Sequence, residues 1–419
     1  MKKALLISAL ASNQGKTLLT TALLEHYKTS VRPYKCGPDF IDPQFHEKIA
    51  KTPSINLDGF MMDENQLRWT FNNYFDKNIA ILEGVMGFYD GMDKNSSAYD
   101  ISKTLEVSTV LVVDGSGSYI TISAILKGML EFRKDNTIKG VVLNKLSSKM
   151  HYELIKKNLE KEVPNIVVCG WIEKDLESLS STHLGLDLQN LEVIENVTKD
   201  VLKNIDLELL ESLMSVTLTG IDFYPFEKIK KQDKLCVVVK DKNFSFLYYD
   251  NLMFLRECYK EVVIVDSTKD EKIVNNADIV VIVGGYVETK QSYERVKNSH
   301  NFKNSLILHV ESCKPVYAEC AGLIYLGQKI DEKPMSGILP ITFSLEEKRQ
   351  RLGYYKCDLD GKTIKGHAFH YSKIQQAPKT DIKLYKVSKK TETAGGYVYK
   401  NVFATYLHTM WRVHKPKGL

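Results

Sequence analysis

The sequence predicts an α/β protein with two doubly wound parallel-sheet domains, and three features of its 419 residues support that prediction. A chain of this length exceeds one ordinary hydrophobic core, so two domains are expected. Short aliphatic and β-branched runs alternate with longer amphipathic stretches, which is typical of parallel strands that are buried on both faces and joined by helices. One segment without strand patterns, at about 217–233, interrupts this alternation.

The first half contains four aliphatic runs that predict strands and two amphipathic stretches that predict helices. The strand runs are Ala4–Ile7, Ile79–Leu82, Thr109–Val113 and Gly140–Leu143, and the helical stretches are Thr17–Tyr27 and Ile120–Phe132. Leu191–Met214 is then predicted as a helix and Thr217–Asp233 as an irregular connection. These patterns place the first domain at 1–225, a linker at 226–233 and the second domain at 234–419.

The second half repeats the alternation with a new set of predicted strands, Cys236–Val239, Val262–Val265, Ile279–Val283 and Pro315–Ala318. Each run is short and largely apolar, as expected for the core of a second parallel sheet. The sequence contains no internal repeat and no low-complexity segment, so neither domain is predicted to be a repeat array.

Composition and charge narrow the classes of protein and partner. Hydrophobic residues make up 43% of the chain and charged residues 26%, as in an ordinary globular protein. The net charge of +5 fits either a lysine-rich composition or anionic ligands such as ATP or a polycarboxylate. Basic runs with interleaved aromatics are lacking, as are apolar stretches of about 18–20 residues, so neither nucleic acid nor a membrane is expected as a partner. Seven scattered cysteines predict no disulfide framework and fit a reducing cytoplasm.

A phosphate-binding loop is predicted where the first strand meets the first helix, at Gln14-Gly15-Lys16-Thr17. Backbone N–H groups must converge on a phosphate, so the turn requires glycine at the closest approach, here Gly15. The helix N-terminus adds a favourable field. Lys16 is expected to neutralise the β- and γ-phosphates of ATP, and the Thr17 hydroxyl to bind Mg²⁺. The glycine that usually opens such a loop is absent here.

Polar side chains near strand ends are candidates for a metal and substrate site at the carboxyl edge of the sheet. Glu83 directly follows an aliphatic run and precedes a glycine, which is the setting expected of a Mg²⁺ ligand. Asp39, Asp42 and Asp90 are further candidates, with Asp39 as a second metal ligand and all three at the site of the substrate. Asn144 follows another strand and could bind a purine base. Each of these residues, taken alone, is equally compatible with a capping or turn role.

A cysteine, Cys320, stands where a predicted strand meets a helix. Such a corner holds the sulfur clear of the backbone, and the helix N-terminus favours the thiolate. The N–H groups of Ala321 and of the Gly284-Gly285 turn are candidates for binding an oxyanion. His408, which follows a late apolar strand, can serve as the base. A cysteine alone is more often a small buried hydrophobe, but these features together favour a nucleophile.

The motifs as a set resemble the cobyrinic acid a,c-diamide synthase family over essentially the whole chain. They occur in the order found in that family, and they are Gly15-Lys16-Thr17, Lys35 with Gly37-Pro38-Asp39-Phe40-Ile41-Asp42-Pro43, Asn56-Leu57-Asp58, Glu83-Gly84-Val85-Met86-Gly87 with Asp90-Gly91, Gly284-Gly285-Tyr286, Tyr317-Ala318-Glu319-Cys320, Gly366-His367 with Phe369-His370-Tyr371-Ser372, and Tyr406-Leu407-His408. The Lys-x-Gly-Pro-Asp segment and the glutaminase motifs are specific for this family when they occur together.

The resemblance implies a P-loop, dethiobiotin-synthetase-like domain followed by a class I glutamine amidotransferase-like domain. It implies a carbon–nitrogen ligase that uses ATP and Mg²⁺ to activate the a- and c-acetate carboxylates of cobyrinate and L-glutamine as the source of ammonia. By matching position, Cys320 is the nucleophile and His408 raises its reactivity, so the oxyanion site is also the expected glutamine site. Asp39 and Asp42 are expected near the transferring phosphoryl group and the incoming ammonia.

Other functions stay open on the sequence alone. The same architecture is expected of enzymes that amidate nickel-sirohydrochlorin or metal-free hydrogenobyrinate, and residues at 40–45 and 88–90 are expected to decide among these acceptors. A P-loop ATPase switch or scaffold is a non-enzymatic alternative, and a degenerate glutaminase domain with a structural role is another. Cys320 and His408 argue against both. The oligomeric state is open, with a homodimer as one alternative.

Three positions depart from the family pattern. Val287 stands where proline usually follows Gly-Gly-Tyr, and Ala368 replaces the glutamate of the Gly-His-Glu-Phe-His segment. Class I amidotransferases carry a glutamate two residues after the histidine, and here that position is Met410. His408 is therefore expected either to act in a dyad with the cysteine or to be oriented by an acid elsewhere.

Overall fold

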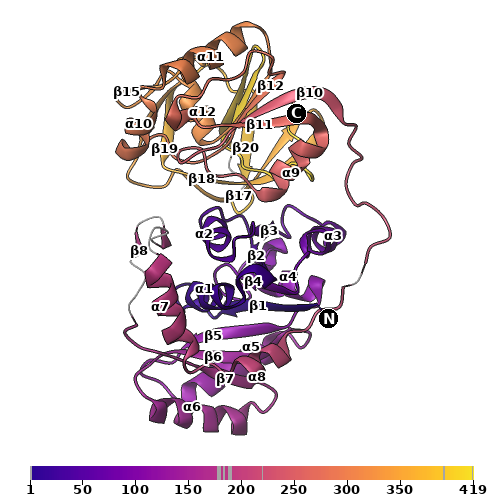
Figure 1. Cartoon of the computed structure of the whole chain (residues 1–419), viewed down its shortest axis with the longest axis vertical. Coiled ribbons are helices and arrows are strands. Elements are labelled where there is room, and N and C mark those ends of the chain that lie inside the picture. Colours follow the sequence, from indigo (N-terminus) through magenta and orange to yellow (C-terminus); the bar gives the residue numbers. More distant parts are fainter. Residues whose placement is uncertain are drawn as a thin grey trace. The chain divides into compact units, whose positions relative to one another are not determined.

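The computed structural model of the chain describes residues 2–176, 181–182, 185–186, 191–218, 220–389, 392–417 and 419. It divides into two compact units, Met1–Pro225 and Phe226–Leu419, and each contains its own large sheet (Figure 1). None of the helices among the described residues is long and apolar enough to cross a membrane. The cytoplasmic location stays a prediction.

The first unit is built on a seven-stranded sheet in which every neighbouring pair is parallel, in the order β3-β2-β4-β1-β5-β6-β7. Its strands are β1 (Lys3–Ala9), β2 (Val31–Cys36), β3 (Ile55–Leu57), β4 (Ile79–Glu83), β5 (Thr109–Asp114), β6 (Ile138–Leu146) and β7 (Val167–Glu173). Its helices are α1 (Lys16–Tyr27), α2 (Ile41–Ala50), α3 (Glu64–Tyr74), α4 (Ala98–Leu105), α5 (Ile120–Phe132), α6 (Lys149–Glu162), α7 (Leu191–Leu202) and α8 (Leu207–Leu213). A two-stranded sheet follows β7 along the chain, formed by β8 (Ser181–Thr182) and β9 (Gly185–Leu186).

The strand order makes this a doubly wound sheet with its switch point at β1. The chain runs from β1 to β2, β3 and β4 on one side and then crosses to β5 on the other. Ligands bind at such points, beyond the carboxyl ends of the strands. The register pairs Ile7 with Glu83 and Ala9 with Val112, so the loop after β1 meets the ends of β4 and β5. The predicted α/β class is confirmed for this unit.

The predicted strands of the first half correspond to β1, β4, β5 and β6, and the two predicted helices to α1 and α5. The sequence prediction omits β2, β3 and β7. In β2 the polar residues Arg32 and Lys35 interrupt the aliphatic pattern, although the whole strand is buried. The prediction of one helix over 191–214 is wrong, because α7 ends at Leu202 and Asp206 starts α8 by accepting a hydrogen bond from the Leu209 N–H at 2.9 Å.

The second unit contains a nine-stranded sheet in the order β11-β10-β12-β13-β22-β21-β20-β17-β18. The parallel part consists of β10 (Gln232–Val239), β11 (Tyr259–Val265), β12 (Ile279–Ile282), β13 (Val316–Glu319) and β22 (Val402–Thr405). The antiparallel part consists of β17 (Arg351–Leu359), β18 (Lys362–His370), β20 (Ile382–Lys386) and β21 (Glu392–Tyr399). A smaller sheet contains β14 (Lys329–Ile330), β15 (Lys333–Pro334), β16 (Thr342–Leu345) and β19 (Ser372–Gln376). The helices are α9 (Tyr249–Cys258), α10 (Lys290–Val296), α11 (His300–Glu311) and α12 (Ala321–Leu326).

The parallel part confirms a second α/β sheet, whereas the antiparallel part is missing from the sequence prediction. Continuous apolar runs reveal strands that are buried on both faces, but β17 and β18 alternate between buried and more exposed residues. β13 lies between β12 and β22. Its carboxyl end, where Cys320 follows Glu319, therefore meets the ends of two neighbouring strands.

Candidate active sites

The loop between β1 and α1 has the form of a phosphate-binding loop. Gly15 precedes the first turn of α1 with a φ of 104°, a left-handed conformation that favours glycine. A Cβ atom at Gly15 would also lie 2.2 Å from Nδ2 of Asn144. That Nδ2 group donates to the carbonyl of Gln14 at 2.8 Å, and the Gln14 side chain accepts from the Asp114 N–H at 2.9 Å. Asn144 thus contacts the backbone of the loop and helps to hold its shape.

Lys16 begins α1 and is 8% exposed. Its ammonium donates to the carbonyl oxygens of Ala11, at 3.0 Å, and Met86, at 2.6 Å. Burial lowers the pKa of Lys16, although the nearby carboxylates of Glu83 and Asp42 act in the opposite direction. Neutral carbonyls are weaker acceptors than phosphate oxygens, which form charge-assisted hydrogen bonds with an ammonium. The position is therefore suited to a phosphate that replaces these carbonyls.

Thr17, the next residue, joins the loop to a buried carboxylate. Its hydroxyl donates to Oε1 of Glu83 at 2.7 Å, and Oε2 of Glu83 lies 2.8 Å from Nε2 of His46. Glu83 is the last residue of β4 and is 1% exposed. Burial opposes its charge, but Lys35, His46 and Thr17 outweigh burial and hold the pKa of Glu83 below its ordinary value. Glu83 is therefore an ionised oxygen donor at the switch point of the sheet.

Lys35, at the end of β2, gathers three carboxylates at the same edge. Its Nζ lies 3.3 Å from Oε1 of Glu83 and 3.3 Å from Oδ2 of Asp39, and it also contacts Asp42. Burial disfavours the ammonium, but the three acids raise the pKa of Lys35 well above its ordinary value. Burial, with Glu83 and Asp39, raises the pKa of Asp42 to about 6 against the effect of Lys35. Asp42 can therefore exchange a proton near neutral pH.

The donor set fits Mg²⁺ in its chemistry. Thr17 and Glu83 offer a hydroxyl and a carboxylate oxygen, and Mg²⁺ usually completes its shell with water and phosphate oxygens. Within the described part of the chain, no group of three or more His, Cys, Asp and Glu side chains is arranged to hold a metal by itself. The further predicted ligand, Asp39, directs Oδ1 to the N–H of Ile41 at 2.8 Å and Oδ2 to Lys35. Thr17 and Glu83 are therefore the stronger candidates.

Residues expected to contact the acceptor lie in less favourable places. Asp90 is exposed, and its Oδ2 accepts from the N–H of Gly87 at 2.8 Å, as a turn residue does. Within the stretches 40–45 and 88–90, the side chains of Phe45 and Phe88 are buried, and the expectation that these stretches decide among the acceptors stays a prediction. Met86 is 46% exposed at the same edge and has a φ of 53°.

The second candidate site forms where β13 meets α12. Cys320 has a φ of 47° and a ψ of −100°, a strained backbone conformation found at nucleophiles on sharp strand-to-helix turns. Its N–H donates to the carbonyl of Thr405 at 2.7 Å, which ties the turn to β22. Ala321 begins α12, so its N–H has no acceptor within the helix. A Cβ atom at Gly322 would lie 2.7 Å from the carbonyl of Ile282, which explains the small residue there.

His408, shortly after β22, contacts this nucleophile. It is 1% exposed and forms a side-chain hydrogen bond with Cys320. Its Nδ1 lies 3.3 Å from Oε2 of Glu319. Burial lowers the pKa of His408, but the bonds with Cys320 and Glu319 outweigh burial and raise the pKa to about 10. A protonated imidazole beside the sulfur favours the thiolate, which is the reactive form of cysteine.

The Gly284-Gly285 turn lies against the same histidine. A Cβ atom at Gly284 would be 2.2 Å from Cε1 of His408, and one at Gly285 would be 1.9 Å from the carbonyl of Asn243. Gly285 also has a φ of 150°, which favours glycine. Both positions therefore require glycine, and the structure brings the predicted oxyanion turn to the predicted base.

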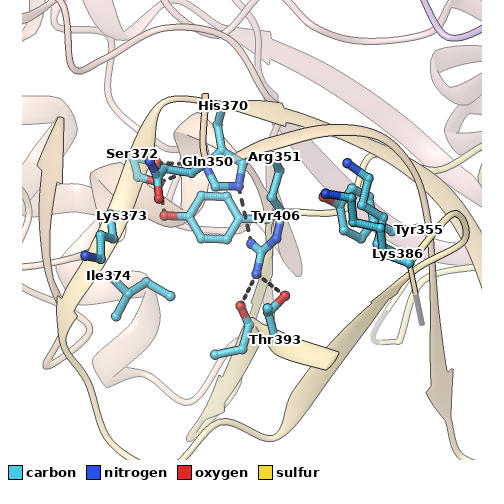
Figure 2. Close-up of a pocket in the computed structure, with 12 residues that line it drawn as sticks. Gln350, Arg351, Tyr355, His370, Ser372, Lys373, Ile374, Lys386, Thr393 and Tyr406 are labelled. Carbon is cyan, nitrogen blue, oxygen red and sulfur yellow. Dashed lines mark hydrogen bonds between the residues drawn. The ribbon is translucent and has the colours of Figure 1, made fainter. Parts of the chain in front are cut away.

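A pocket of about 390 Å³ opens in the antiparallel part of this unit (Figure 2). The guanidinium of Arg351 donates to Oγ1 of Thr393 at 2.8 Å, contacts the carbonyl of Ala394 and lies 3.2 Å from Nε2 of His370. His370 stacks on Tyr406 with ring centroids 3.8 Å apart. Three lysines add positive charge to the lining, and they are Lys373, Lys386 and Lys389.

Electrostatic effects link this pocket to the nucleophile. Burial, and to a smaller extent the charge of Cys320, raises the pKa of Tyr406. Burial lowers the pKa of His370 to about 3, with Arg351 and His408 acting in the same direction. His370 is therefore neutral, and Arg351 is a buried cation that lies 3.2 Å from Nε2 of His370. Such a lining favours a carboxylate ligand.

Three residues of these sites were not predicted from the sequence, and they are Glu319, His46 and Arg351. Glu319 and His408 are 89 positions apart in the chain, and the adjacent Cys320 is the only sequence signal for Glu319. His46 lies inside α2 and Arg351 at the start of an antiparallel strand, where no motif marks them. The fold alone brings these side chains to the two sites.

Similarity to known proteins identifies the family of this chain. Residues 236–416 match the model of the CobB/CobQ-like glutamine amidotransferase domain. The cobyrinate a,c-diamide synthase of Caldanaerobacter subterraneus is 33% identical over 435 residues, which cover 97% of this chain and 95% of that protein. The protein of that name from Fusobacterium nucleatum is 34% identical over 439 residues, 97% of each chain. The one from Methanocaldococcus jannaschii is 31% identical over 442 residues, 97% of this chain and 95% of its own.

These matches confirm the resemblance that the motifs predict. They extend over nearly the full length of each relative, so both units are shared. The glutamine amidotransferase domain and the class of glutamine-dependent, amide-forming ligases are confirmed with them, and the phosphate loop agrees with the use of a nucleotide. The chain belongs to the cobyrinate a,c-diamide synthase family.

Proposed function

We propose that this chain uses ATP and L-glutamine to amidate the a- and c-acetate carboxylates of cobyrinate in cobalamin biosynthesis. The observation that carries the proposal is the buried Cys320–His408 pair, because a P-loop switch or scaffold has no use for a site that releases ammonia. The acceptor is proposed from the relatives that share both units and are named cobyrinate a,c-diamide synthase.

The amidotransferase domain, 234–419, is proposed to supply the ammonia. The Cys320 thiolate attacks the side-chain amide carbon of glutamine, and the N–H groups of Gly285 and Ala321 stabilise the oxyanion. The imidazolium of His408 gives its proton to the leaving nitrogen, which departs as ammonia and leaves a thioester on the sulfur. His408 then takes a proton from the water that hydrolyses the thioester to glutamate.

The pocket around Arg351 is the proposed receptor for the α-carboxylate of glutamine. This carboxylate and the reacting amide belong to one small molecule, so a cation is needed near Cys320. Burial lowers the pKa of Arg351, and Tyr406, Tyr355, Tyr397 and Cys320 act in the opposite direction. A planar guanidinium can bind a carboxylate through two parallel hydrogen bonds. The lysines at the lining add long-range attraction for an anion.

The first domain, 1–225, is proposed to activate the acceptor. Ammonia does not displace hydroxide from a carboxylate, so the γ-phosphoryl group of ATP is transferred to it to provide a leaving group. The loop at Gly15 binds the phosphates through its N–H groups, and Lys16 neutralises their charge. Thr17 and Glu83 would hold Mg²⁺, which supplies charge stabilisation to the transferring phosphoryl when bound. Lys35 places a further fixed positive charge beside them.

Asp42 is the proposed base of the amidation step. The nitrogen that attacks the acyl phosphate must lose a proton, and an acid with a pKa of about 6 is largely ionised at pH 7 and can accept it. Asp39 shares the Lys35 ammonium with Asp42, and Asp90 fixes the turn at Gly87. Both are proposed to position the substrate site.

Parallel assays with three acceptors test this function. The protein is incubated with ATP, Mg²⁺, glutamine labelled at its amide nitrogen and one of cobyrinate, hydrogenobyrinate or nickel-sirohydrochlorin. Mass spectrometry is expected to show two labelled amides on cobyrinate, with two ATP and two glutamine consumed per molecule. Turnover of nickel-sirohydrochlorin with none of cobyrinate would overturn the acceptor. Amide formation without ATP consumption would overturn the activation step.

A further inference from the structure

The acid partner of His408 is absent from its usual place, two residues further along the chain. Met410 occupies that position, and its apolar side chain is 2% exposed. We propose that Glu319, the residue before the nucleophile, is the positioning acid of His408, an assignment that rests on the glutaminase function proposed for Cys320. The site is then a cysteine, a histidine and a glutamate, with the acid and the nucleophile adjacent in sequence.

The two carboxylate oxygens of Glu319 have different partners. Oε2 lies 3.3 Å from Nδ1 of His408. Oε1 accepts from the hydroxyl of Tyr317 at 2.8 Å and from Nε1 of Trp411 at 2.8 Å. Glu319 and His408 are both almost completely buried. The two neutral donors therefore fix the carboxylate through one oxygen, and the other oxygen is left to the imidazole.

The segment after His408 is anchored so that Trp411 reaches this carboxylate. Asn251 of α9 accepts from the Trp411 N–H at 2.8 Å and donates to the carbonyl of Thr409 at 2.9 Å. Trp411 itself is fully buried. The indole is thus held from its backbone, and its N–H has a fixed direction toward Glu319. The position of Met410, between these anchors, is filled by an apolar side chain that cannot replace the acid.

A purely structural carboxylate would be costly here. Burial of an ion costs several kcal/mol unless a charged partner and hydrogen bonds compensate for it. His408 is the charged partner of Glu319 when its imidazole is protonated, and the same imidazole forms a side-chain hydrogen bond with Cys320. A histidine whose Nδ1 faces a carboxylate keeps its other nitrogen for the reacting group. Glu319 therefore selects the orientation and the tautomer in which His408 serves Cys320.

The backbone at Cys320 explains how two adjacent residues reach one imidazole. Neighbours on a regular strand point to opposite faces of the sheet. Glu319 is the last residue of β13, and the strand breaks at Cys320, where φ is 47°. The turn redirects the sulfur, so both side chains meet His408. Other titratable groups near His408 are His370 at the end of β18, whose pKa His408 helps to lower, and Arg351 at the start of β17, which lies 3.2 Å from Nε2 of His370.

Two substitutions distinguish a positioning role of Glu319 from a purely structural role. Glu319→Gln keeps the size of the side chain and an acceptor for Tyr317 and Trp411 but removes the charge. Glu319→Asp keeps the charge. Glutamate release without any acceptor is expected to fall in kcat by about 100-fold in Glu319→Gln, with KM little changed. Glu319→Asp should recover much of that loss, and amidation with ammonium salts should equal the wild type in both.

A titration of Cys320 gives a readout that needs no turnover. In a Cys313→Ser background, because Cys313 is exposed, the alkylation rate of Cys320 is followed against pH by peptide mass spectrometry. The pH at which the alkylation rate is half-maximal, the alkylation midpoint, is expected to rise by about one unit or more in Glu319→Gln. The control is Glu271→Gln in the same unit, because among the described residues the Glu271 carboxylate accepts a hydrogen bond only from the Asp266 N–H. This control variant should match the wild type.

The outcomes are distinct. A wild-type kcat for glutamate release in Glu319→Gln, or an unchanged alkylation midpoint, would overturn the assignment. Equal loss with glutamine and with ammonium, together with a lower melting temperature, would also overturn it in favour of a structural role. A raised alkylation midpoint in a chain that releases no glutamate would refute the proposed function and support the positioning role of Glu319.

Discussion

Gly284→Ala should inactivate the glutaminase by moving its base. The new Cβ atom would lie 2.2 Å from Cε1 of His408, whereas carbon atoms in contact are about 3.5 Å apart, so one of them must move by more than about 1 Å. The backbone at Gly284 is held, because its carbonyl accepts from the Phe246 N–H at 2.9 Å. The imidazole is also held, by Cys320 and Glu319. Moving the ring therefore breaks at least one of these two bonds.

The expected magnitude follows from that displacement. A misplacement of about 1 Å can cost about 100-fold in rate, so kcat/KM for glutamine should fall by roughly that factor. Overpacking should also lower the free energy of unfolding of the second unit by about 1–3 kcal/mol. Glutamate release and amidation with ammonium are measured on the same preparation. Ammonium-supported amidation should stay at the wild-type level, because the phosphate site lies in the other unit.

Gly128→Ala is the matched control. Gly128 lies in α5, and among the described residues no atom comes within 4 Å of a Cβ placed there. Both activities should be unchanged in this variant. A folded Gly284→Ala variant with full glutaminase activity would contradict this prediction, because His408 would then act from a position that tolerates the displacement.

Three further predictions concern the first unit. Lys16→Ala should abolish ATP-dependent amidation with either nitrogen source and leave glutamate release measurable, as product analysis with both sources can show. Glu83→Gln should raise the Mg²⁺ concentration that gives half-maximal activity, and unchanged kinetics at limiting Mg²⁺ would remove Glu83 from the metal site. Burial raises the pKa of Asp42 to about 6 from 3.8, so the native state binds this proton more tightly and stability falls as pH rises through that window. Asp42→Asn should remove the fall and stabilise the first unit at pH 7.5 by about 3 kcal/mol in thermal unfolding, and an unchanged pH dependence would contradict this.

The fold was predictable where burial is complete. β1, β4, β5 and β6 each contain a largely apolar, buried run because both faces of the central sheet are covered, and this continuity marks them in the sequence. β2 is equally buried but contains Arg32 and Lys35, whose charges are satisfied by distant acids. The sequence cannot show those acids, so β2 lacks the signal. Strands that alternate, such as β17 and β18, are missed because they lack a continuous apolar run.

The candidate sites divide in the same way. Motifs that require a local backbone shape, such as Gly15 at the helix start and Cys320 at the elbow, are visible as short patterns. Pairings across the fold are not visible, and these include Glu319 with His408 and His46 with Glu83. Side chains far apart in the chain meet only through strand order and register. The sequence therefore shows that the usual acid of His408 is missing, but only the structure shows that Glu319 lies beside its imidazole.

The division of labour between the two units is tested most directly by Cys320→Ala. Amidation of cobyrinate is measured twice with this variant, once with glutamine and once with an ammonium salt as the nitrogen source. Glutamine-supported amidation should be abolished, because the variant lacks the sulfur that is proposed to form the thioester, and ammonium-supported amidation should stay close to the wild-type rate. Equal loss with both nitrogen sources would contradict the separation of ammonia release from carboxylate activation.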